Sequence, residues 1–375
     1  MTALQQCEAG LEATLAALSR DGLLRQTRLP QGIDLVSNDY LGLAEHPYIR
    51  EQMRDALNRL PAGSGGSRLL RGHHPVFEQM EARLADFSGT SSALLFGSGY
   101  AANIGLLQAV VSPGDCIFSD ELNHASLIDG MRLVKAETVV YPHQDLCALE
   151  SALEKPRTGR AIIVTESVFS MDGDLTPLAG IASLAERHDA VLIVDEAHAT
   201  GIYGKRGAGR VEELGLRPRV LATMHTGGKA LGSGGAWVAG SRALCDVMVN
   251  RARTFIFSTA PMPVLCAALN AALDLLTREP ERRREVLRKA ALVRSRLASL
   301  GVNAAEPSPI VPIVAGSNDA AIALQRGLCA AGFDVRAIRP PTVPAGTARL
   351  RMTVRYPVPD GDLIRFTDTV LQLSR

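Results

Sequence analysis

Lysine is rare in this chain of 375 residues, and one lysine lies in a setting that suits chemistry. Only five of the 40 lysine and arginine residues are lysines. Lys229 lies in residues 226–232, a glycine-rich stretch with no other charged side chain. An isolated amine in such a turn can form a Schiff base with an aldehyde cofactor, or it can be an ordinary solvated loop lysine. The segment alone leaves both interpretations open.

An acidic residue at the end of an apolar run gives this lysine a chemical partner. The apolar residues 191–194 are followed directly by Asp195, and His198 comes shortly afterwards. Pyridoxal phosphate needs a lysine for its Schiff base and an acid that keeps its pyridine nitrogen protonated. Asp195 could also cap a helix. Asp195 and His198 lack the further ligands of a metal site, so we predict a pyridoxal phosphate site and no metal.

Three weaker signals have competing interpretations. Residues 98–100 separate a predicted strand from a predicted helix, so their amides could hold a phosphate or form a plain turn. His124 is isolated and could be a structural histidine. Residues 63–66 superficially suggest a dinucleotide-binding loop, but a charged, helix-like stretch precedes them where that fingerprint requires a strand.

The elements that must position these residues alternate between strands and helices. Short apolar runs at residues 93–96, 116–118, 139–141, 161–164 and 191–194 predict strands, and amphipathic stretches between them predict helices. Such a pattern indicates a mostly parallel sheet covered on both faces, whose ligands gather at the carboxyl ends of the strands. Asp195 occupies that kind of position. Further helices are predicted at 3–20, 47–60, 75–87, 281–300, 320–330 and 360–373.

The bulk composition is that of an ordinary globular protein. Hydrophobic residues make up 46% of the chain, charged residues 21%, and the net charge is +1, which gives no argument for a nucleic acid or membrane partner. The six cysteines form no C-x-x-C pair, so we expect reduced, mostly buried thiols. Glu8 and Glu12 interrupt any signal-peptide core. We therefore expect a cytoplasmic protein.

Nine segments, in order along nearly the whole chain, resemble the α-oxoamine synthases. They are residues 37–43, 63–72, 97–103, 120–126, 166–174, 195–198, 226–232, 255–260 and 339–351. The resemblance implies the α/β fold of type I pyridoxal phosphate-dependent transferases, with a mostly parallel seven-stranded sheet sandwiched by helices. It also implies a homodimer and three parts: an N-terminal helical segment (1–48), a large cofactor-binding domain (49–278) and a small α+β C-terminal domain (279–375).

The resemblance assigns roles around the ring of pyridoxal phosphate. Lys229 would form the Schiff base and act as a catalytic residue, and Asp195 would pair with the pyridine nitrogen. His124 would stack on the ring face, and it too would be catalytic. His198 and Ser170 would contact the phenolic oxygen.

A second group of residues is implied at the cofactor's phosphate. Gly99, Tyr100 and Thr226 would hold it within one subunit. Ser258 and Thr259 would reach it from a second subunit. The Gly227-Gly228 pair replaces a bulkier or hydroxyl residue that the family often has, so we expect a looser turn before the lysine.

Substrate contacts are implied at several further positions. Arg351 resembles the clamp for the amino acid carboxylate, a task suited to a guanidinium fork, with Asn38 assisting it and His124 close to the substrate. Arg25 and Thr342 would contact the acyl substrate. In the N-terminal region Arg20 and Arg28 are alternatives to Arg25.

The resemblance also implies a reaction. Residues 340–344 favour the branch of the family that acts in biotin synthesis, which joins L-alanine to a pimeloyl thioester with loss of carbon dioxide. The thioester could be carried by coenzyme A or by acyl carrier protein. Alternatives are a sibling enzyme that joins glycine to acetyl-CoA or succinyl-CoA, or serine to palmitoyl-CoA, and an aminotransferase of the same fold. A non-catalytic partner subunit is the alternative from another class.

Overall fold

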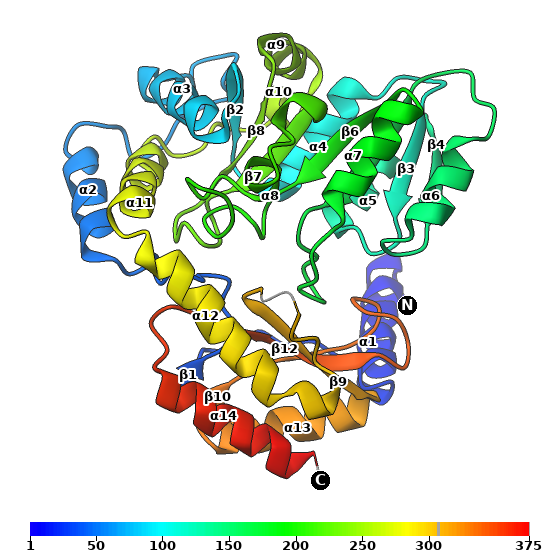
Figure 1. Cartoon of the computed structure of the whole chain (residues 1–375), viewed down its shortest axis with the longest axis vertical. Helices are drawn as coiled ribbons and strands as arrows, with labels where there is room; N and C mark the ends of the chain where they lie inside the picture. Colours follow the sequence, from blue (N-terminus) through cyan, green and yellow to red (C-terminus); the bar gives the residue numbers. More distant parts are fainter. Residues whose placement is uncertain (306–307, 375) are drawn as a thin grey trace. The chain divides into compact units, whose positions relative to one another are not determined.

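The computed structural model describes residues 1–305 and 308–374, and it forms two compact units (Figure 1). The large unit comprises Asn38–Ser170 and Asp174–Val286. The small unit comprises Met1–Ser37, Met171–Gly173 and Leu287–Arg375. The N-terminal residues thus belong to the same unit as the C-terminal ones.

A seven-stranded sheet forms the centre of the large unit, with the strand order β2-β8-β7-β6-β5-β3-β4. β8 pairs antiparallel with both of its neighbours, and the other neighbouring strands pair in parallel. This confirms the predicted mostly parallel seven-stranded sheet. The strands are β2 (Ser92–Phe96), β3 (Cys116–Asp120), β4 (Glu137–Tyr141), β5 (Ala161–Glu166), β6 (Ala190–Asp195), β7 (Ala222–Thr226) and β8 (Ala236–Gly240).

Helices bury both faces of the inner part of this sheet, which explains why strands such as β5 are apolar without alternation, whereas the edge strand β4 is largely exposed (Figure 1). In β5, Ile162 and Val164 pack into one core and Ile163 into the other. Each such side chain contributes about 1.5–3 kcal/mol on burial. The first face is covered by α4 (Gly99–Val110), α5 (Ala125–Arg132), α9 (Arg242–Arg251) and α10 (Arg253–Ile256), and the second by α6 (Leu146–Leu153), α7 (Leu178–Arg187) and α8 (Arg210–Glu213).

Further helices of the large unit pack beside the sheet. α2 (Pro47–Leu57) and α3 (Pro75–Ser88) both contact α11 (Leu265–Arg278), and η1 (Arg217–Arg219) is a short 3-10 turn. α2 and α3 each begin with proline, whose missing N–H costs nothing at a helix start. α12 (Glu281–Arg296) begins in the large unit, and from Leu287 it belongs to the small unit, whose core includes Ala290 and Val293. It is shorter than predicted, because η2 (Ala298–Leu300) and the left-handed Gly301 end it.

The small unit is an α+β structure with its own core. β11 (Ala337–Ile338), β12 (Ala348–Thr353) and β9 (Ile310–Gly316) form an antiparallel sheet in that order, and β1 (Ile33–Asp34) pairs in parallel with β10 (Phe333–Asp334). The core includes Phe333 and Phe366, whose ring centroids lie 5.3 Å apart. The helices are α1 (Ala3–Arg20), α13 (Asn318–Ala330) and α14 (Asp360–Leu373).

The burial of the cysteines differs from the prediction, and one lysine outside the predicted site is buried. Cys7, Cys147 and Cys329 are exposed, so half of the six free thiols are not buried. Lys289 is buried, and its amine donates to the carbonyls of Tyr356 at 2.7 Å and Val358 at 2.8 Å. The local sequence pattern does not predict this burial, because the carbonyl acceptors lie in a loop that is distant in the sequence.

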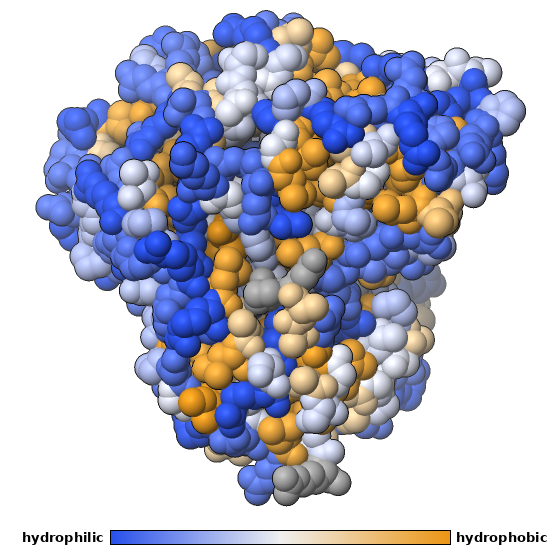
Figure 2. All heavy atoms as spheres, in the orientation of Figure 1, coloured by the Kyte–Doolittle hydropathy of each residue, from blue (hydrophilic) through white to orange (hydrophobic). Residues whose placement is uncertain are grey.

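The surface is mixed in character. Figure 2 shows apolar residues scattered among hydrophilic ones on the face in view. Across residues 1–305 and 308–374, none of the helices combines the length and apolar character that a membrane span needs.

Candidate active site

Lys229 lies in a tight turn between the adjacent strands β7 and β8. The N–H of Gly227 donates to the carbonyl of Gly235 at 2.9 Å, and the N–H of Gly232 donates to the carbonyl of Lys229 at 2.9 Å. β7 ends at Thr226, whose hydroxyl donates to the carbonyl of Gly235 at 3.1 Å. These bonds hold the lysine backbone at the carboxyl end of β7.

The paired glycines tighten this turn, contrary to the expectation that they loosen it. A Cβ atom at Gly227 would lie 2.4 Å from the carbonyl oxygen of Gly234 and 2.5 Å from a methyl group of Leu269. Gly228 has room for a side chain, and its N–H donates to the hydroxyl of Thr226 at 3.2 Å. Glycine is therefore required at 227 because the two chain segments approach so closely.

A chain of hydrogen bonds leads away from the Lys229 amine. Its Nζ lies 2.7 Å from Nε2 of His198, and Nδ1 of His198 lies 2.6 Å from the hydroxyl of Tyr40. That hydroxyl donates to Oδ1 of Asn38 at 3.2 Å. The two contacts engage both ring nitrogens of His198, so they fix the orientation of the ring between Tyr40 and Lys229.

Asp195 ends β6 and has fixed hydrogen-bond donors. Its Oδ2 accepts from Nδ2 of Asn103 at 2.8 Å, and its Oδ1 accepts from the N–H of Ala197 at 2.8 Å. Nδ2 of Asn103 also donates to the hydroxyl of Ser126 at 2.9 Å, which lies 2.8 Å from Nδ1 of His124. One asparagine on α4 therefore links the two predicted catalytic residues Asp195 and His124.

His124 is held as a neutral ring. Burial lowers the pKa of His124, and the positive charge of Lys229 lowers it further, against the opposing effect of Asp195. Nδ1 accepts from the N–H of Ser126 at 3.2 Å, so the ring proton is on Nε2. A neutral, oriented imidazole suits the predicted stacking role.

Glu166 is a buried acid that the sequence interpretation missed. It ends β5 directly opposite Asp195 in the sheet register. Burial raises the pKa of Glu166 well above its usual range, and the charge of Asp195 raises it further, while Lys229 and the backbone N–H of His124 act in the opposite direction. Burial therefore favours the neutral form of Glu166, whereas two N–H donors at 2.8 Å stabilise the carboxylate of Asp195.

The start of α4 forms a cradle beside the end of β7. The hydroxyl of Ser98 caps the helix by accepting from the N–H of Ala101 at 3.2 Å. A Cβ atom added to Gly99 would lie 3.4 Å from Cε of Met224 and 4.0 Å from Cβ of Thr226. Free amides at a helix start attract anions. Gly99 and Thr226 thus lie together where the cofactor phosphate was predicted.

The other residues predicted to bind the cofactor differ from one another in burial and in hydrogen bonding. Tyr100 is exposed, and its hydrogen bond to Asp129 raises the pKa of the phenol. Ser170 is buried after β5. Ser258 and Thr259 follow α10 and are exposed, and no hydrogen bond joins them to Lys229 among the residues that the structure describes.

The small unit contains the other predicted substrate residues. The guanidinium of Arg25 donates to the hydroxyl of Thr342 at 3.2 Å, so the two residues assigned to the acyl substrate contact each other. Arg351 is buried on β12 and donates to the hydroxyl of Thr353 at 3.1 Å. These roles stay predictions.

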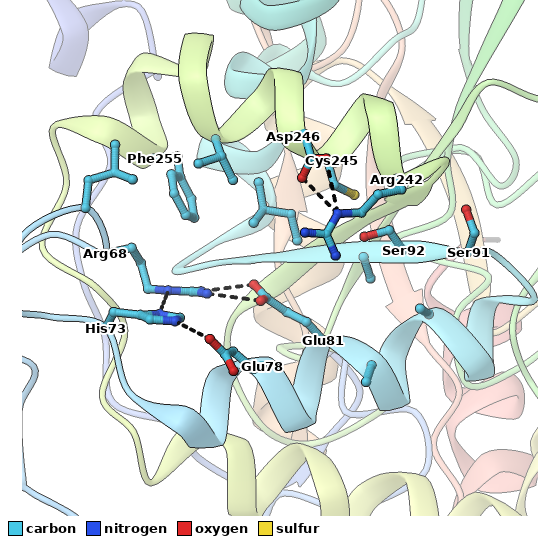
Figure 3. A pocket seen from close by; sticks show the side chains of 16 residues that line it. Arg68, His73, Glu78, Glu81, Ser91, Ser92, Arg242, Cys245, Asp246 and Phe255 are labelled. Atoms are coloured by element: carbon cyan, nitrogen blue, oxygen red, sulfur yellow. Dashed lines mark hydrogen bonds and ion pairs between the residues drawn. The ribbon is translucent and has the colours of Figure 1, made fainter.

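A cavity of about 590 Å³ in the large unit is not the predicted site (Figure 3). Its polar groups bind one another: Arg68 forms two bonds of 3.0 Å with Glu81 and one of 2.8 Å with His73. His73 in turn lies 2.9 Å from Glu78. The Arg68 guanidinium also lies over the ring of Phe255. This network stabilises the fold around α3 and leaves its charges satisfied.

The residues around Lys229 fit pyridoxal phosphate. They provide an amine, a buried carboxylate with fixed donors, a neutral histidine, and a capped helix start whose Gly99 leaves space beside Thr226. In the described parts of the chain, no group of three or more His, Cys, Asp or Glu residues is placed to hold a metal ion.

Comparisons with known proteins agree with this site. The family Aminotransferase class I and II matches residues 30–363. The chain is 50% identical over 323 residues to the 8-amino-7-oxononanoate synthase of Anaeromyxobacter dehalogenans, a match that covers 86% of this chain and 81% of the relative. It is 44% identical over 378 residues to the enzyme of the same name from Pelobacter propionicus, covering 96% and 97%. A solved structure of serine palmitoyltransferase from S. paucimobilis, with a bound PLP–myriocin aldimine, is similar with a TM-score of 0.90 and 27% identity, covering 100% of this chain and 99% of that one.

Proposed function

The chain belongs to the class I and II aminotransferase family, and we propose that it is an 8-amino-7-oxononanoate synthase of biotin biosynthesis. The reaction is the decarboxylative condensation of L-alanine with a pimeloyl thioester, which releases carbon dioxide and the free thiol. The observation that supports it best is the cluster of Lys229, His198 and Asp195 in a chain 44–50% identical to relatives of that name.

Pyridoxal phosphate is the cofactor. When bound, it supplies an electron sink that stabilises negative charge on the amino acid Cα. We propose that Lys229 holds it covalently and that Asp195 faces its ring nitrogen. Gly99, Tyr100 and Thr226 hold its phosphate. In this arrangement the charged Asp195, paired with Asn103, favours a protonated ring nitrogen.

The chain's own residues then move protons. Nζ of Lys229 removes and returns the Cα proton, and Nε2 of His198, which lies 2.7 Å from the amine, orients it. His124 packs on the reacting face, held by Ser126. Asn38 and Arg351 bind the alanine carboxylate, while Arg25 and Thr342 contact the acyl substrate.

We further propose a cytoplasmic homodimer. Phe257, which directly precedes Ser258, is 70% exposed, and Leu70 is 80% exposed in the loop whose Gly66 carbonyl accepts from the N–H of Ala260. Ser258 and Thr259 are exposed, which a contact with a second subunit requires. Light scattering would give the mass in solution. Mixing a Lys229→Ala protomer with a Thr259→Asp protomer should restore activity if sites are shared.

Product analysis tests the reaction. The holoenzyme is incubated with pimeloyl-CoA and alanine, glycine or serine in parallel, and products are identified by mass spectrometry. Formation of 8-amino-7-oxononanoate with alanine supports the proposal. Preference for glycine or serine would identify a sibling enzyme, and a 2-oxo acid without carbon dioxide would identify an aminotransferase.

A further inference from the structure

A group of polar residues in the large unit lies outside the proposed cofactor contacts, at the carboxyl ends of three neighbouring strands. Asp120 ends β3, which lies between β4 and β5 in the sheet and is parallel to both. His143 and Gln144 follow β4, and Asp174 lies in the loop that follows β5. Because the carboxyl ends of parallel strands meet at one edge of a sheet, these four residues come together at the edge where ligands bind.

His143 and Gln144 each bind both carboxylates. Nδ1 of His143 lies 2.8 Å from Oδ1 of Asp120, and Nε2 lies 2.6 Å from Oδ2 of Asp174. The N–H of Gln144 donates to Oδ2 of Asp120 at 2.9 Å, and its side-chain amide donates to Oδ2 of Asp174 at 2.6 Å. We call this pair of residues the His143–Gln144 bridge. It reaches from the end of β4, across the end of β3, to the loop after β5.

Asp120 connects the bridge to the loop that carries His124. Its Oδ1 also accepts from the N–H of Leu122 at 2.9 Å, and its carbonyl accepts from the N–H of Asn123 at 3.2 Å. His124 is the next residue and caps α5. A displacement of Asp120 would therefore move the imidazole that we propose to pack on the cofactor ring.

Asp174 connects the bridge to Ser170. Its carbonyl accepts from the N–H of Phe169 at 3.1 Å, and the ring of His143 meets the ring of Phe169 edge-on, with centroids 4.4 Å apart. Ser170 follows Phe169 directly. The hydroxyl predicted to contact the phenolic oxygen of the cofactor is therefore attached to the same bridge.

The backbone of Gln144 has an unfavourable conformation that the bridge enforces. Its φ is 56°, in the left-handed region. Across residues 1–305 and 308–374, Asp189 is the other non-glycine residue with a positive φ, and it directly precedes β6 at the amino end of that strand. Such a conformation persists only where the surroundings hold it, and it is frequent at functional sites. The bonds from Gln144 to Asp120 and Asp174 supply this constraint.

We propose that His143 and Gln144 are positioning residues that hold His124 and Ser170 at a fixed separation around the ring of bound pyridoxal phosphate. The proposal rests on the proposed function for the roles of His124 and Ser170. Carboxylates occupy both ring nitrogens of His143, so its imidazole has no free nitrogen for proton transfer with a substrate. It acts by orienting the two loops.

Hydrogen exchange of the holoenzyme at pH 7 tests the bridge without relying on turnover. His143→Gln has one amide nitrogen in place of two ring nitrogens on opposite sides, so it cannot hold both carboxylates as histidine does. The amides of residues 120–126 and 167–170 should both exchange at least about tenfold faster. His188→Gln is the matched control, because His188 pairs with Glu150 at 3.7 Å beyond the end of α7. Unchanged exchange in both segments of His143→Gln would overturn the proposal.

A second variant separates the two arms of the bridge. Asparagine tolerates the left-handed backbone but is one methylene shorter than glutamine, so Gln144→Asn should fold and lose only the bond to Asp174. Exchange should then accelerate in residues 167–170 and stay at the wild-type rate in residues 120–126. Equal acceleration in both segments would show general loosening of the fold and would contradict the bridge.

The bound cofactor shows whether positioning matters for the site. In both variants the absorbance band of bound pyridoxal phosphate should shift, and kcat should fall about tenfold while the KM for the pimeloyl thioester stays the same. Faster exchange with a wild-type band and a wild-type kcat would mean that the bridge only stabilises the fold, and would overturn the proposal. A shifted band in a protein that makes a product other than 8-amino-7-oxononanoate would support the bridge and refute the proposed function alone.

Discussion

Glu166 and Asp195 lie opposite each other at the ends of the neighbouring parallel strands β5 and β6, both buried. Two carboxylates so close do not both ionise readily. Asp195 receives two hydrogen bonds of 2.8 Å, which favour its charged form. Burial raises the pKa of Glu166, and the charge of Asp195 adds to this effect. The two acids thus lie in opposite environments, because hydrogen bonds stabilise the carboxylate of Asp195 and burial favours the neutral form of Glu166.

This difference predicts opposite results for two isosteric substitutions. Asp195→Asn removes the charge that faces the ring nitrogen, so kcat should fall about 10²–10³-fold. Glu166→Gln replaces a neutral acid with a neutral amide, so kcat should stay within about tenfold of the wild type. Steady-state kinetics and the cofactor's absorbance spectrum check both. A larger loss in Glu166→Gln than in Asp195→Asn would contradict the assignment.

Glu166 also shows what local sequence patterns could and could not predict. The rule that selects Asp195, an acid at the end of an apolar strand, also selects Glu166, so the sequence contains the signal for both residues. Asn103 and Tyr40 are different. Asn103 bonds to Asp195 across 92 residues, and Tyr40 bonds to His198 across 158. Such pairs depend on how helices and loops pack over the sheet, which periodicity does not determine.

Five strands of the large sheet could be predicted from short apolar runs, because buried parallel strands are often continuously apolar, whereas the number seven came from the resemblance to the α-oxoamine synthases. β7 and β8 are harder to predict from the sequence. β7 in particular contains His225 and two threonines, so it is not an apolar run. In the fold His225 stacks on Trp237 with an interplanar angle of 12°, and burial lowers the pKa of His225 to about 3. A neutral, stacked histidine behaves as an apolar residue, which composition alone does not reveal.

The central prediction is a covalent bond between Lys229 and pyridoxal phosphate. Lys229→Ala should still bind pyridoxal phosphate through the remaining contacts, but it should lose the covalent link and at least about a thousandfold in kcat. Borohydride reduction followed by peptide mapping should label Lys229 in the wild type and no lysine in the variant. Labelling of Lys289 or of another lysine in the wild type would refute the assignment.

Tyr40 is predicted to orient His198. Tyr40→Phe leaves Nδ1 of His198 without its 2.6 Å partner inside the protein, a loss that costs about 1–3 kcal/mol. We expect a lower thermal midpoint and a kcat reduced about tenfold, with the KM for alanine little changed. Tyr48→Phe is the matched control, because Tyr48 bonds to Asp274, which belongs to a different cluster. Equal effects of the two substitutions on kcat would show that Tyr40 does not orient His198.

Because of His143, the stability of the fold should decrease at alkaline pH. Burial lowers the pKa of His143, but hydrogen bonds to Asp120 and Asp174, with the charges of these carboxylates, outweigh burial and raise the pKa to about 10. Because this pKa is raised above the unfolded value of about 6.5, the stabilisation is complete below pH 6.5 and is lost as pH rises towards 10.

The thermal midpoint of the wild type and of His143→Gln, measured from pH 6 to pH 10, checks this prediction. The wild type should be more stable at pH 6, and the difference should shrink as pH rises. Since Asp120 also accepts from the N–H of Leu122 in the loop that leads to His124, cofactor binding should weaken in parallel. A pH-independent difference would show that the ion pairs do not cause the stabilisation.

Gly99 tests the phosphate cradle, since a methyl group at this position would occupy the space between the start of α4 and Thr226. Its Cβ would lie 3.4 Å from the flexible end of Met224, so the apo fold of Gly99→Ala should tolerate it with little change in thermal midpoint. The Kd for pyridoxal phosphate should rise about tenfold because the helix amides and the phosphate can no longer approach closely. Gly97→Ala is the control in the same loop, since a Cβ there meets nothing within 4 Å. If the two variants bind the cofactor equally well, the phosphate does not lie at the start of α4.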